Sequence, residues 1–233
     1  MDVNRLALEL ESFAPEKALE TVLGANSTAR ICLTSSFQAE DMIVTHLLRK
    51  RIPDIAVLFL DTGYHFPETY EYRDRMTQQW SLNLVNVLPA QTVAEQEAAF
   101  GVLYRSEPTR CCQLRKVEPL MRALEPFDVW FTGLRREQSP TRKNLKKVEV
   151  HRLPTAKNLW KVSLLADWNW EQVWQYAIES GIPHLPQYDE GYFSIGCQPC
   201  TALPSDPNNP RSGRWGGTKL ECGIHTFSTQ VER

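Results

Sequence analysis

Short apolar runs alternate with segments of helical periodicity through the first half of the chain. Four runs have the length and composition of buried strands: residues 29–35, 55–61, 82–87 and 129–133. Between the first two runs, residues 39–50 place apolar side chains one helical turn apart, as an amphipathic helix does. Because strands that alternate with helices at this spacing form βαβ units, the pattern predicts an α/β fold with a parallel sheet.

The pattern changes at the two ends of the chain. The first roughly 25 residues have helical periodicity that is interrupted at Pro15. After residue 150 we predict a strand over residues 159–165 and a helix over residues 170–181 that ends at Gly181. From about Tyr188 onward the chain is rich in Gly, Pro, Asn and Ser, which is typical of loops.

We therefore expect a single domain over residues 1–233. Its α/β core should cover about residues 25–200. Residues 201–233 should form a loop-rich, mobile C-terminal segment.

Composition and charge exclude some classes of partner. The 233 residues have a formal net charge of −2, so the chain lacks the basic excess of a nucleic-acid-binding protein. No apolar run approaches the ~18 residues of a membrane span, and the acidic, amphipathic N-terminus does not resemble a signal peptide. We expect a cytoplasmic protein with no nucleic-acid or membrane partner. The sequence does not determine the oligomeric state, and a homo-oligomer is one of the states that it leaves open.

Six cysteines in a reducing compartment are more often metal-binding or catalytic than disulfide-bonded. Cys32 lies in the first apolar run, and we expect it in the core. Cys111 and Cys112 are adjacent, and Cys197 and Cys200 form a C-x-x-C in GCQPC. Four thiolates suit structural zinc or an iron–sulfur cluster. Adjacent cysteines reach two irons of a cubane more easily than one small ion, which favours the cluster. A redox dithiol beside a coincidental pair is the alternative.

The sixth cysteine, Cys222, lies in ECGIH with His225 three residues later. A nearby cation would lower the pKa of this thiol and populate the nucleophilic thiolate. A Cys/His pair of metal ligands is the alternative, but four thiolates already complete a metal site. The nucleophile is therefore favoured. Its place near the chain end, after RSGRWGGTK, would let it move between a buried site and the surface.

Four basic residues form a further candidate group, and most of them lie near a cysteine site. Arg142, Arg211 and Arg214 lie in expected loops, and Lys116 lies beside the adjacent cysteines. Each alone is explained most simply as a solvated surface charge. Together they predict an anion pocket built from three guanidinium groups and one ammonium.

The loops that end the first two apolar runs are a second candidate binding region. SSFQAED (35–41) offers serine hydroxyls and a helix N-terminus, which suit a phosphate. DTG (61–63) follows the next run. Both should lie at the carboxyl edge of the sheet, where open parallel sheets bind ligands. Serine-capped helices are also common without any ligand.

The order of these motifs resembles a known family. The first strand with SSFQAED, then LDTGYHFPETY, CCQLRKVEPL, TGLRREQSPTR, GCQPCT and ECGIH follow one another from about residue 30 to 225. In this combination the chain resembles the assimilatory adenylyl-sulfate (APS) reductases, the iron–sulfur branch of the APS/PAPS reductase family, where PAPS carries an additional 3′-phosphate. It departs from the related ATP pyrophosphatases, because Phe37 and Gln38 stand where those enzymes have a glycine-rich pyrophosphate loop.

The resemblance implies an adenine nucleotide α-hydrolase-like fold, related to the ATP pyrophosphatases. It implies thioredoxin-dependent reduction of APS to sulfite and AMP through a cysteine S-sulfonate, in sulfate assimilation and cysteine biosynthesis. It implies Cys222 as the nucleophile. One four-iron, four-sulfur cluster is implied on Cys111, Cys112, Cys197 and Cys200. The residues implied at the phosphosulfate are Lys116, Arg142, Arg211, Arg214 and His225. Those implied at the adenosine side are Ser35, Ser36, Asp61, Thr62, Gly63 and Gly133.

Three other functions fit parts of the sequence. A PAPS reductase, or an enzyme that accepts both substrates, would use the same chemistry. An ATP-dependent thiolation or adenylating enzyme of the same superfamily would need the glycine-rich loop that this chain lacks. A non-catalytic zinc-binding interaction protein would leave ECGIH and the loop arginines unexplained.

Overall fold

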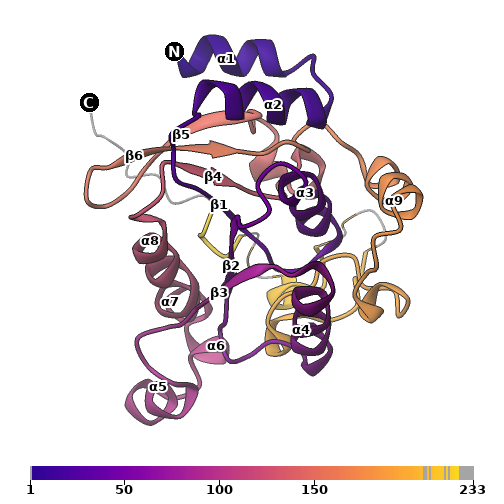
Figure 1. Cartoon of the computed structure of the whole chain (residues 1–233). Helices are drawn as coiled ribbons and strands as arrows, with labels where there is room; N and C mark the ends of the chain where they lie inside the picture. The colour runs from indigo at the N-terminus through magenta and orange to yellow at the C-terminus, as the bar shows by residue number, and fades with distance from the viewer. Residues whose placement is uncertain (1, 207–208, 210, 218, 220, 226–233) are drawn as a thin grey trace.

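The computed structural model describes residues 2–206, 209, 211–217, 219 and 221–225. Its strands form a six-stranded sheet in the order β3-β2-β1-β4-β6-β5 (Figure 1). The strands are β1 (Ile31–Thr34), β2 (Ala56–Leu60), β3 (Asn83–Val87), β4 (Val129–Phe131), β5 (Val148–Arg152) and β6 (Asn158–Val162). Neighbouring strands are parallel, apart from the antiparallel pair β5 and β6. The predicted α/β class with a mostly parallel sheet is confirmed.

Helices cover both faces of this sheet (Figure 1). They are α1 (Val3–Leu10), α2 (Pro15–Ala25), α3 (Ala39–Arg49), α4 (Pro67–Trp80), α5 (Val93–Phe100), α6 (Leu103–Ser106), α7 (Pro108–Cys112), α8 (Glu118–Leu124) and α9 (Trp170–Glu179). Helices α3 and α4 lie on one side of the strands, and α7 and α8 on the other. Within the described residues, no helix is long and apolar enough to cross a membrane.

Side chains of the central strands alternate between two hydrophobic cores. Leu33 and Phe131 pack into the core that α1, α2, α3, α4 and α9 share. Cys32, Leu58 and Trp130 pack into the second core, beneath α8. Since successive strand residues point to opposite faces, a strand covered on both faces is apolar at nearly every position. The predicted core position of Cys32 is confirmed.

The sequence pattern predicts every strand of the sheet except β5, at one of its edges. Strand β6 and helix α9 lie where strand and helix were predicted, and Gly181, with φ of 60°, follows the end of α9 in a left-handed conformation. Strand β5 was not predicted. It lies at the edge of the sheet, its sequence VEVHR is mostly polar, and only two of its five residues are buried. An edge strand needs no continuous apolar run, so periodicity does not distinguish it from a loop.

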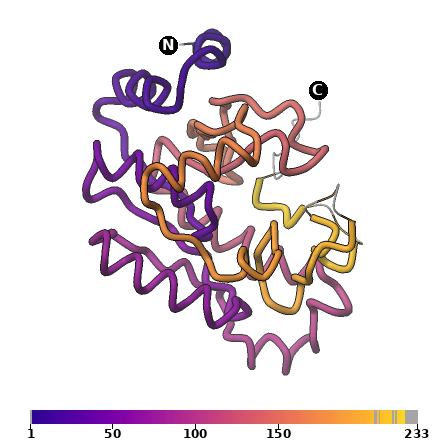
Figure 2. The backbone as a smooth tube through the Cα atoms, turned by 90° about the vertical axis from the view of Figure 1, so that its right-hand side faces the viewer, coloured from indigo at the N-terminus to yellow at the C-terminus, as the bar shows by residue number. Residues whose placement is uncertain are grey.

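The described part of the C-terminal region has loops, as predicted. Beyond Tyr188 the described residues contain only short 3₁₀ turns and isolated bridges. The chain then returns toward the middle of the molecule (Figure 2). Residues 207–208, 210, 218, 220 and 226–233 lie outside the described residues. The predicted mobility of residues 201–233 stays a prediction.

The strand order places a binding crevice between β1 and β4. From β1 the chain builds β2 and β3 on one side, and it later places β4 on the other side of β1. Loops that leave the carboxyl ends of β1 and β4 therefore diverge in opposite directions. In open α/β sheets such a switch point is where ligands bind.

Candidate active site

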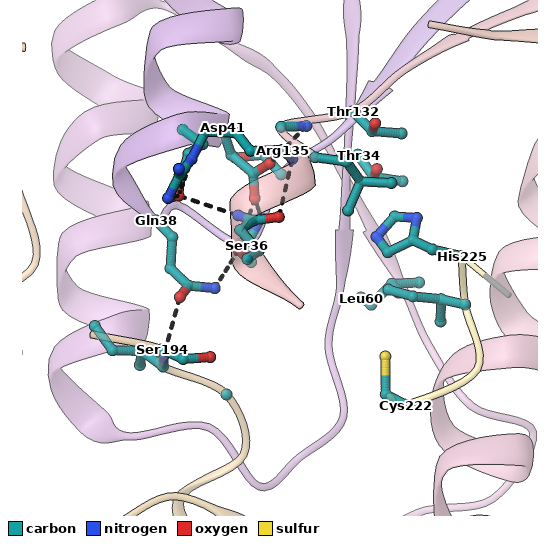
Figure 3. Close-up of a pocket in the computed structure, with 18 of the residues that line it drawn as sticks. Thr34, Ser36, Gln38, Asp41, Leu60, Thr132, Arg135, Ser194, Cys222 and His225 are labelled. Atoms are coloured by element: carbon teal, nitrogen blue, oxygen red, sulfur yellow. Dashed lines mark hydrogen bonds and ion pairs between the residues drawn. The ribbon is translucent and has the colours of Figure 1, made fainter. Parts of the chain in front are cut away.

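A cavity of about 460 Å³ opens at the carboxyl ends of β1, β2 and β4. The loop after β1 lines one side with Ser36 and Gln38, and the first turn of α3 adds Asp41, while Cys222 and His225 line the opposite side (Figure 3). The lining includes these residues predicted from the sequence: Ser35, Ser36, Lys116, Gly133, Arg142, Arg211, Arg214, Cys222 and His225. The fold thus brings together residues up to 190 positions apart in the chain, as Ser35 and His225 are (225 − 35).

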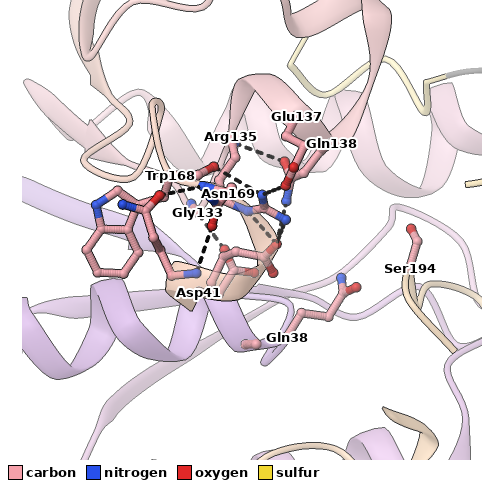
Figure 4. A network of polar contacts seen from close by, with 12 residues as sticks. Gln38, Asp41, Gly133, Arg135, Glu137, Gln138, Trp168, Asn169 and Ser194 are labelled. Carbon is pink, nitrogen blue, oxygen red and sulfur yellow. Dashed lines mark hydrogen bonds and ion pairs between the residues drawn. The ribbon is translucent and has the colours of Figure 1, made fainter. Parts of the chain in front are cut away.

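Asp41 joins the two loops that diverge at the switch point. Its carboxylate accepts hydrogen bonds from the backbone N–H of Ser36 (2.6 Å) and from the Ser36 hydroxyl (2.6 Å) (Figure 3). It also accepts one from the backbone N–H of Gly133 (3.2 Å) (Figure 4). A Cβ at Gly133 would lie 2.3 Å from Asp41 Oδ1, so only glycine permits this approach. Burial raises the pKa of Asp41 to about 6, against the effect of the Ser36 hydrogen bonds. The hydrogen bonds of Asp41 therefore hold the loops after β1 and β4 together without a bound ligand.

A buried ion pair supports the same side of the cavity. Glu40 Oε1 accepts from Arg135 Nε at 2.9 Å and from Gln138 Nε2 at 3.0 Å. Arg135 also donates to Glu137 (2.7 Å) and to the backbone carbonyl of Trp168 (3.2 Å). The side chains of Arg135 and Glu40 are only 4% and 7% exposed. Charged groups on this side thus find fixed partners inside the protein.

Lys116 and Arg214 line the cavity close to the sulfurs of Cys197 and Cys222. Burial lowers the pKa of Lys116, but the sulfurs of Cys197 and Cys222 outweigh it, and the net pKa lies above its ordinary value. Lys116 is therefore an ammonium at neutral pH. Arg214 is 5% exposed, its guanidinium lies over the Trp215 ring at 4.7 Å, and its Nε has no hydrogen-bond partner among the described residues. These cations are well suited to an incoming anion.

Gly196 gives Arg214 the space that it needs. A Cβ at Gly196 would lie 2.1 Å from a terminal nitrogen of the Arg214 guanidinium. The residue precedes the C-x-x-C, and the loop that contains it is held by a bridge between Cys197 and His65. The sequence did not indicate this role for Gly196, because the contact joins residues that are 18 positions apart in an irregular segment (214 − 196).

The segment that carries Cys222 is anchored by Glu221. Its carboxylate accepts from Arg142 Nε (2.9 Å) and from an Arg142 terminal nitrogen (2.7 Å), and also from the Thr141 hydroxyl (2.8 Å). A terminal nitrogen of Arg211 lies 3.8 Å from Glu221 Oε2. Arg142 lowers the pKa of Glu221 by hydrogen bonding and charge, which outweighs the opposing effect of burial. Two of the predicted anion-binding arginines thus have a carboxylate partner in the protein.

His225 anchors the other end of this segment. Its ring stacks on Trp130 with centroids 5.7 Å apart, and its backbone carbonyl accepts from Lys161 Nζ at 3.3 Å. Burial lowers the pKa of His225 well below its ordinary value, so the imidazole is neutral at pH 7. Cys222, between the two anchors, lines the cavity.

The four remaining site cysteines line one small pocket beside the main cavity. Cys111, Cys112, Cys197 and Cys200 are all present in its lining, and each is a free thiol. Thr62 Oγ1 lies 3.2 Å from Cys197 Sγ. The adjacent pair ends α7 and is followed by a π-helical turn over Gln113–Val117. Pro119 lacks the N–H that an α-helix would use there, which explains the wider turn.

The donor chemistry of this pocket fits an iron–sulfur cluster. In the described part of the chain, no group of three or more His, Cys, Asp or Glu side chains has an arrangement that could hold a single metal ion. A cubane instead offers each thiolate its own iron, so the four sulfurs need not converge on one point. Burial and the other three thiols together raise the pKa of Cys111 to about 11, as expected for sulfurs that share one small volume.

The DTG segment lies apart from the cavity lining. Asp61 accepts from the Tyr70 hydroxyl (2.7 Å) and from the Gly63 N–H (3.0 Å), which makes a tight turn after β2. Thr62 faces Cys197 and lines the cysteine pocket. Asp61, Thr62 and Gly63 were predicted on the adenosine side, and the lining of the main cavity includes none of them.

Several residues that build the site were not singled out from the sequence. They are Glu40, Asp41, Arg135, Gln138 and Glu221. Each lies inside a motif that the sequence analysis quoted, which was the available signal. Their pairings join positions up to 98 apart, so the partners could not be read from local spacing.

Fold and site together define an α/β protein of the adenine nucleotide α-hydrolase-like fold, with a cationic, thiol-bearing cavity at its switch point. The structure is similar to that of phosphoadenylyl-sulfate reductase from Candida auris in complex with phosphate. The TM-score is 0.72, with 23% sequence identity, and the match covers 86% of this chain and 96% of that one.

The phosphoadenosine phosphosulfate reductase domain matches residues 30–203. The chain belongs to this family. It is 42% identical over 228 residues to the phosphoadenosine 5′-phosphosulfate reductase of Gloeobacter violaceus, covering 96% of this chain and 93% of the relative. It is also 42% identical over 198 residues to the adenosine 5′-phosphosulfate reductase of Geobacillus kaustophilus, covering 84% and 83%.

Proposed function

We propose that this protein reduces adenylyl sulfate to sulfite and AMP, with thioredoxin as the reductant. One observation carries the proposal: the Cys222 thiol shares a cavity with Lys116, Arg142, Arg211 and Arg214. A nucleophilic sulfur and a set of cations are what attack on an anionic sulfur compound requires. The relatives named adenosine 5′-phosphosulfate reductase support the choice of substrate.

In the first step the Cys222 thiolate attacks the sulfur of the sulfate group. A bond forms between the two sulfurs, the bond from that sulfur to the bridging phosphate oxygen breaks, and AMP leaves with the bond electrons. The product is an S-sulfonate on Cys222. Because nucleophile and substrate are both anionic, Lys116 and Arg214 must compensate charge on the sulfate and phosphate oxygens. Removing one such contact should slow the step by roughly a hundred- to thousand-fold.

In the second step a thiolate of reduced thioredoxin attacks Cys222 Sγ. Sulfite leaves with the electron pair of the sulfur–sulfur bond, and a mixed disulfide forms between the two proteins. The second thioredoxin thiol resolves this disulfide and returns Cys222 as a thiolate. The dithiol supplies both electrons. Since the reductant must reach Cys222, we propose that the segment that carries it moves between the two steps.

We propose that Cys111, Cys112, Cys197 and Cys200 hold one four-iron, four-sulfur cluster. The shared pocket and the adjacent pair support this set of ligands. Bound there, the cluster would supply a fixed metal–sulfur centre beside Lys116. Free thiols and a dithiol reductant both require a reducing compartment, so we propose that the reaction takes place in the cytoplasm.

The nucleophile is tested by mass spectrometry on anaerobically purified enzyme mixed with APS alone. We expect one AMP released per chain and one SO₃ group on the Cys222 peptide. Cys222→Ser should form neither product while it still binds APS in calorimetry, whereas the control Cys32→Ala, at a buried strand position, should form both. Turnover by Cys222→Ser would refute the assignment. Roughly four irons per chain are expected in the same sample, and one zinc would refute the cluster.

PAPS is the alternative substrate. The Gloeobacter violaceus relative, which is named for it, covers 96% of this chain. Values of kcat/KM for APS and PAPS, measured with the same enzyme and thioredoxin, separate the two. We expect the higher value with APS. A higher value with PAPS would move the assignment to the alternative while leaving the chemistry at Cys222 unchanged.

A further inference from the structure

The carboxylate of Glu221 lies inside a pocket that otherwise concentrates positive charge. It belongs to the residue directly before Cys222, its side chain is 9% exposed, and it forms a two-point pair with Arg142 at 2.9 and 2.7 Å. A carboxylate there opposes the binding of an anionic substrate, because it neutralises part of the charge that would attract it. Its presence calls for a role other than substrate binding.

The Glu221–Arg142 pair is connected to the rigid side of the cavity. An Arg142 terminal nitrogen donates to Gln138 Oε1, and Gln138 Nε2 donates to Glu40 at 3.0 Å. Glu40 is in turn paired with the buried Arg135. A continuous set of polar contacts therefore runs from the scaffold of the strand ends to the residue beside the nucleophile.

Arg142 retains capacity for a substrate while it holds Glu221. Three of its N–H groups donate to Glu221 and Gln138. A guanidinium has five, so two remain for an anion in the cavity. One cation can thus contact the substrate and the nucleophile segment at the same time.

The same segment is held again three residues after Cys222. His225 stacks on Trp130, and Lys161 donates to the His225 carbonyl at 3.3 Å. With anchors on both sides, Cys222 has little freedom to leave its place in the cavity lining. A reacting atom held in this way reacts faster than a free one, since its position is set before the attack.

We propose that Glu221 is a positioning residue: its ion pair with Arg142 holds the Cys222 sulfur over the substrate for the first step. This rests on the proposed role of Cys222 as the nucleophile. The second step needs no such docking, because the reductant approaches from outside. Loss of the pair should therefore slow sulfonation and leave the release of sulfite unchanged or faster.

The test compares Glu221→Gln, which keeps the shape and removes the charge, with Glu11→Gln as the matched control. Glu11 accepts from Arg136 through both oxygens at 2.7 Å, and neither residue lines the cavity. Single-turnover sulfonation at saturating APS should fall by about 10- to 100-fold in Glu221→Gln only. Release of sulfite by thioredoxin from enzyme that is already sulfonated should not fall. Glu221→Asp should recover part of the sulfonation rate, since it restores the charge.

A second readout needs no substrate. The alkylation rate of Cys222 by iodoacetamide, followed on its own peptide by mass spectrometry, should rise in Glu221→Gln and stay at the wild-type value in Glu11→Gln. If the wild type forms no S-sulfonate, the proposed function fails, and alkylation alone still decides whether Glu221 docks the segment.

Three results would overturn the docking role. One is faster sulfonation in Glu221→Gln, which would mean that the carboxylate only repels the substrate. Another is an unchanged alkylation rate. The third is an equal loss in both half-reactions together with a lower melting temperature, which would indicate a general structural role.

Discussion

The two sides of the cavity differ in how their charged groups are paired. On the strand-end side, Glu40 and Arg135 neutralise each other, and Asp41 accepts three hydrogen bonds from Ser36 and Gly133. On the thiol side, Lys116 faces sulfurs, and Arg214 has a buried Nε that finds no hydrogen-bond partner in the described part of the chain. The first side is complete without a ligand, whereas the second is suited to accept an anion.

This difference predicts where the cost of a mutation should fall. A charge that already has a buried partner contributes to the folded state, and its removal leaves the partner unpaired. A charge that faces the cavity costs stability to bury and contributes mainly when the substrate is bound. Substitutions on the strand-end side should therefore lower stability, and those on the thiol side should lower the rate.

The largest effect is expected from Arg135→Met. It leaves Glu40, 7% exposed, without its ion-pair partner, and should lower the free energy of unfolding by about 3–5 kcal/mol. Urea denaturation at pH 7 measures this. The control is Arg136→Met, which breaks a pair with Glu11 whose side chains are 31% and 37% exposed, and it should cost about 0–1 kcal/mol. Equal losses of stability in the two variants would contradict the view that the charges on the strand-end side are paired within the protein.

The second effect is expected from Lys116→Met. The rate of the first step should fall by about a hundred- to thousand-fold, or ~2–4 kcal/mol in the barrier, while the free energy of unfolding stays near the wild-type value. Single-turnover AMP release measures the rate, on samples of equal iron content. Lys50→Met, at an exposed lysine beyond α3, should leave it unchanged. A loss of stability without a loss of rate would mean that Lys116 stabilises the fold and does not act in the first step.

The third effect concerns the pH dependence of stability. On the thiol side, the Trp130 ring contacts both His151 and His225. Burial, with Lys161, lowers the pKa of His151 to about 4 from 6.5. The folded state keeps His151 neutral, and the unfolded chain takes up a proton below pH 6.5, so stability falls as the pH falls toward 4. Between pH 7 and pH 5 the wild type should lose about 2 kcal/mol more than His151→Gln. Parallel losses in urea denaturation would show that His151 does not contribute.

The smallest effect is expected from Gly196→Ala. The added Cβ would lie 2.1 Å from the Arg214 guanidinium, whose flexible side chain can move aside, so the first step should slow by about tenfold without loss of folding. Gly24→Ala, where nothing lies within 4 Å of the new Cβ, is the matched control for kcat/KM. An unchanged rate in Gly196→Ala would mean that the position of Arg214 does not matter.

Three of the strands that the sequence predicted correctly share one physical cause. Strands β1, β2 and β4 are buried on both faces, and both cores require apolar side chains along them. Strand β5 has one edge without a partner strand and several polar positions, so it left no comparable signal. Burial on two faces leaves a clear signal in a sequence, whereas an edge strand is predicted in one case, β3, and missed in the other, β5.

The chemistry of individual residues was readable in the same local way. Adjacent cysteines, a C-x-x-C and ECGIH are recognised by residue type and spacing, and the sequence alone determined these candidates and the fold class. The tertiary structure decided the rest. It paired Glu221 with Arg142, joined Asp41 to Gly133, and turned Thr62 toward Cys197. Side-chain pairing depends on distances in space between segments far apart in the chain, and no local pattern of apolar and polar residues encodes those distances.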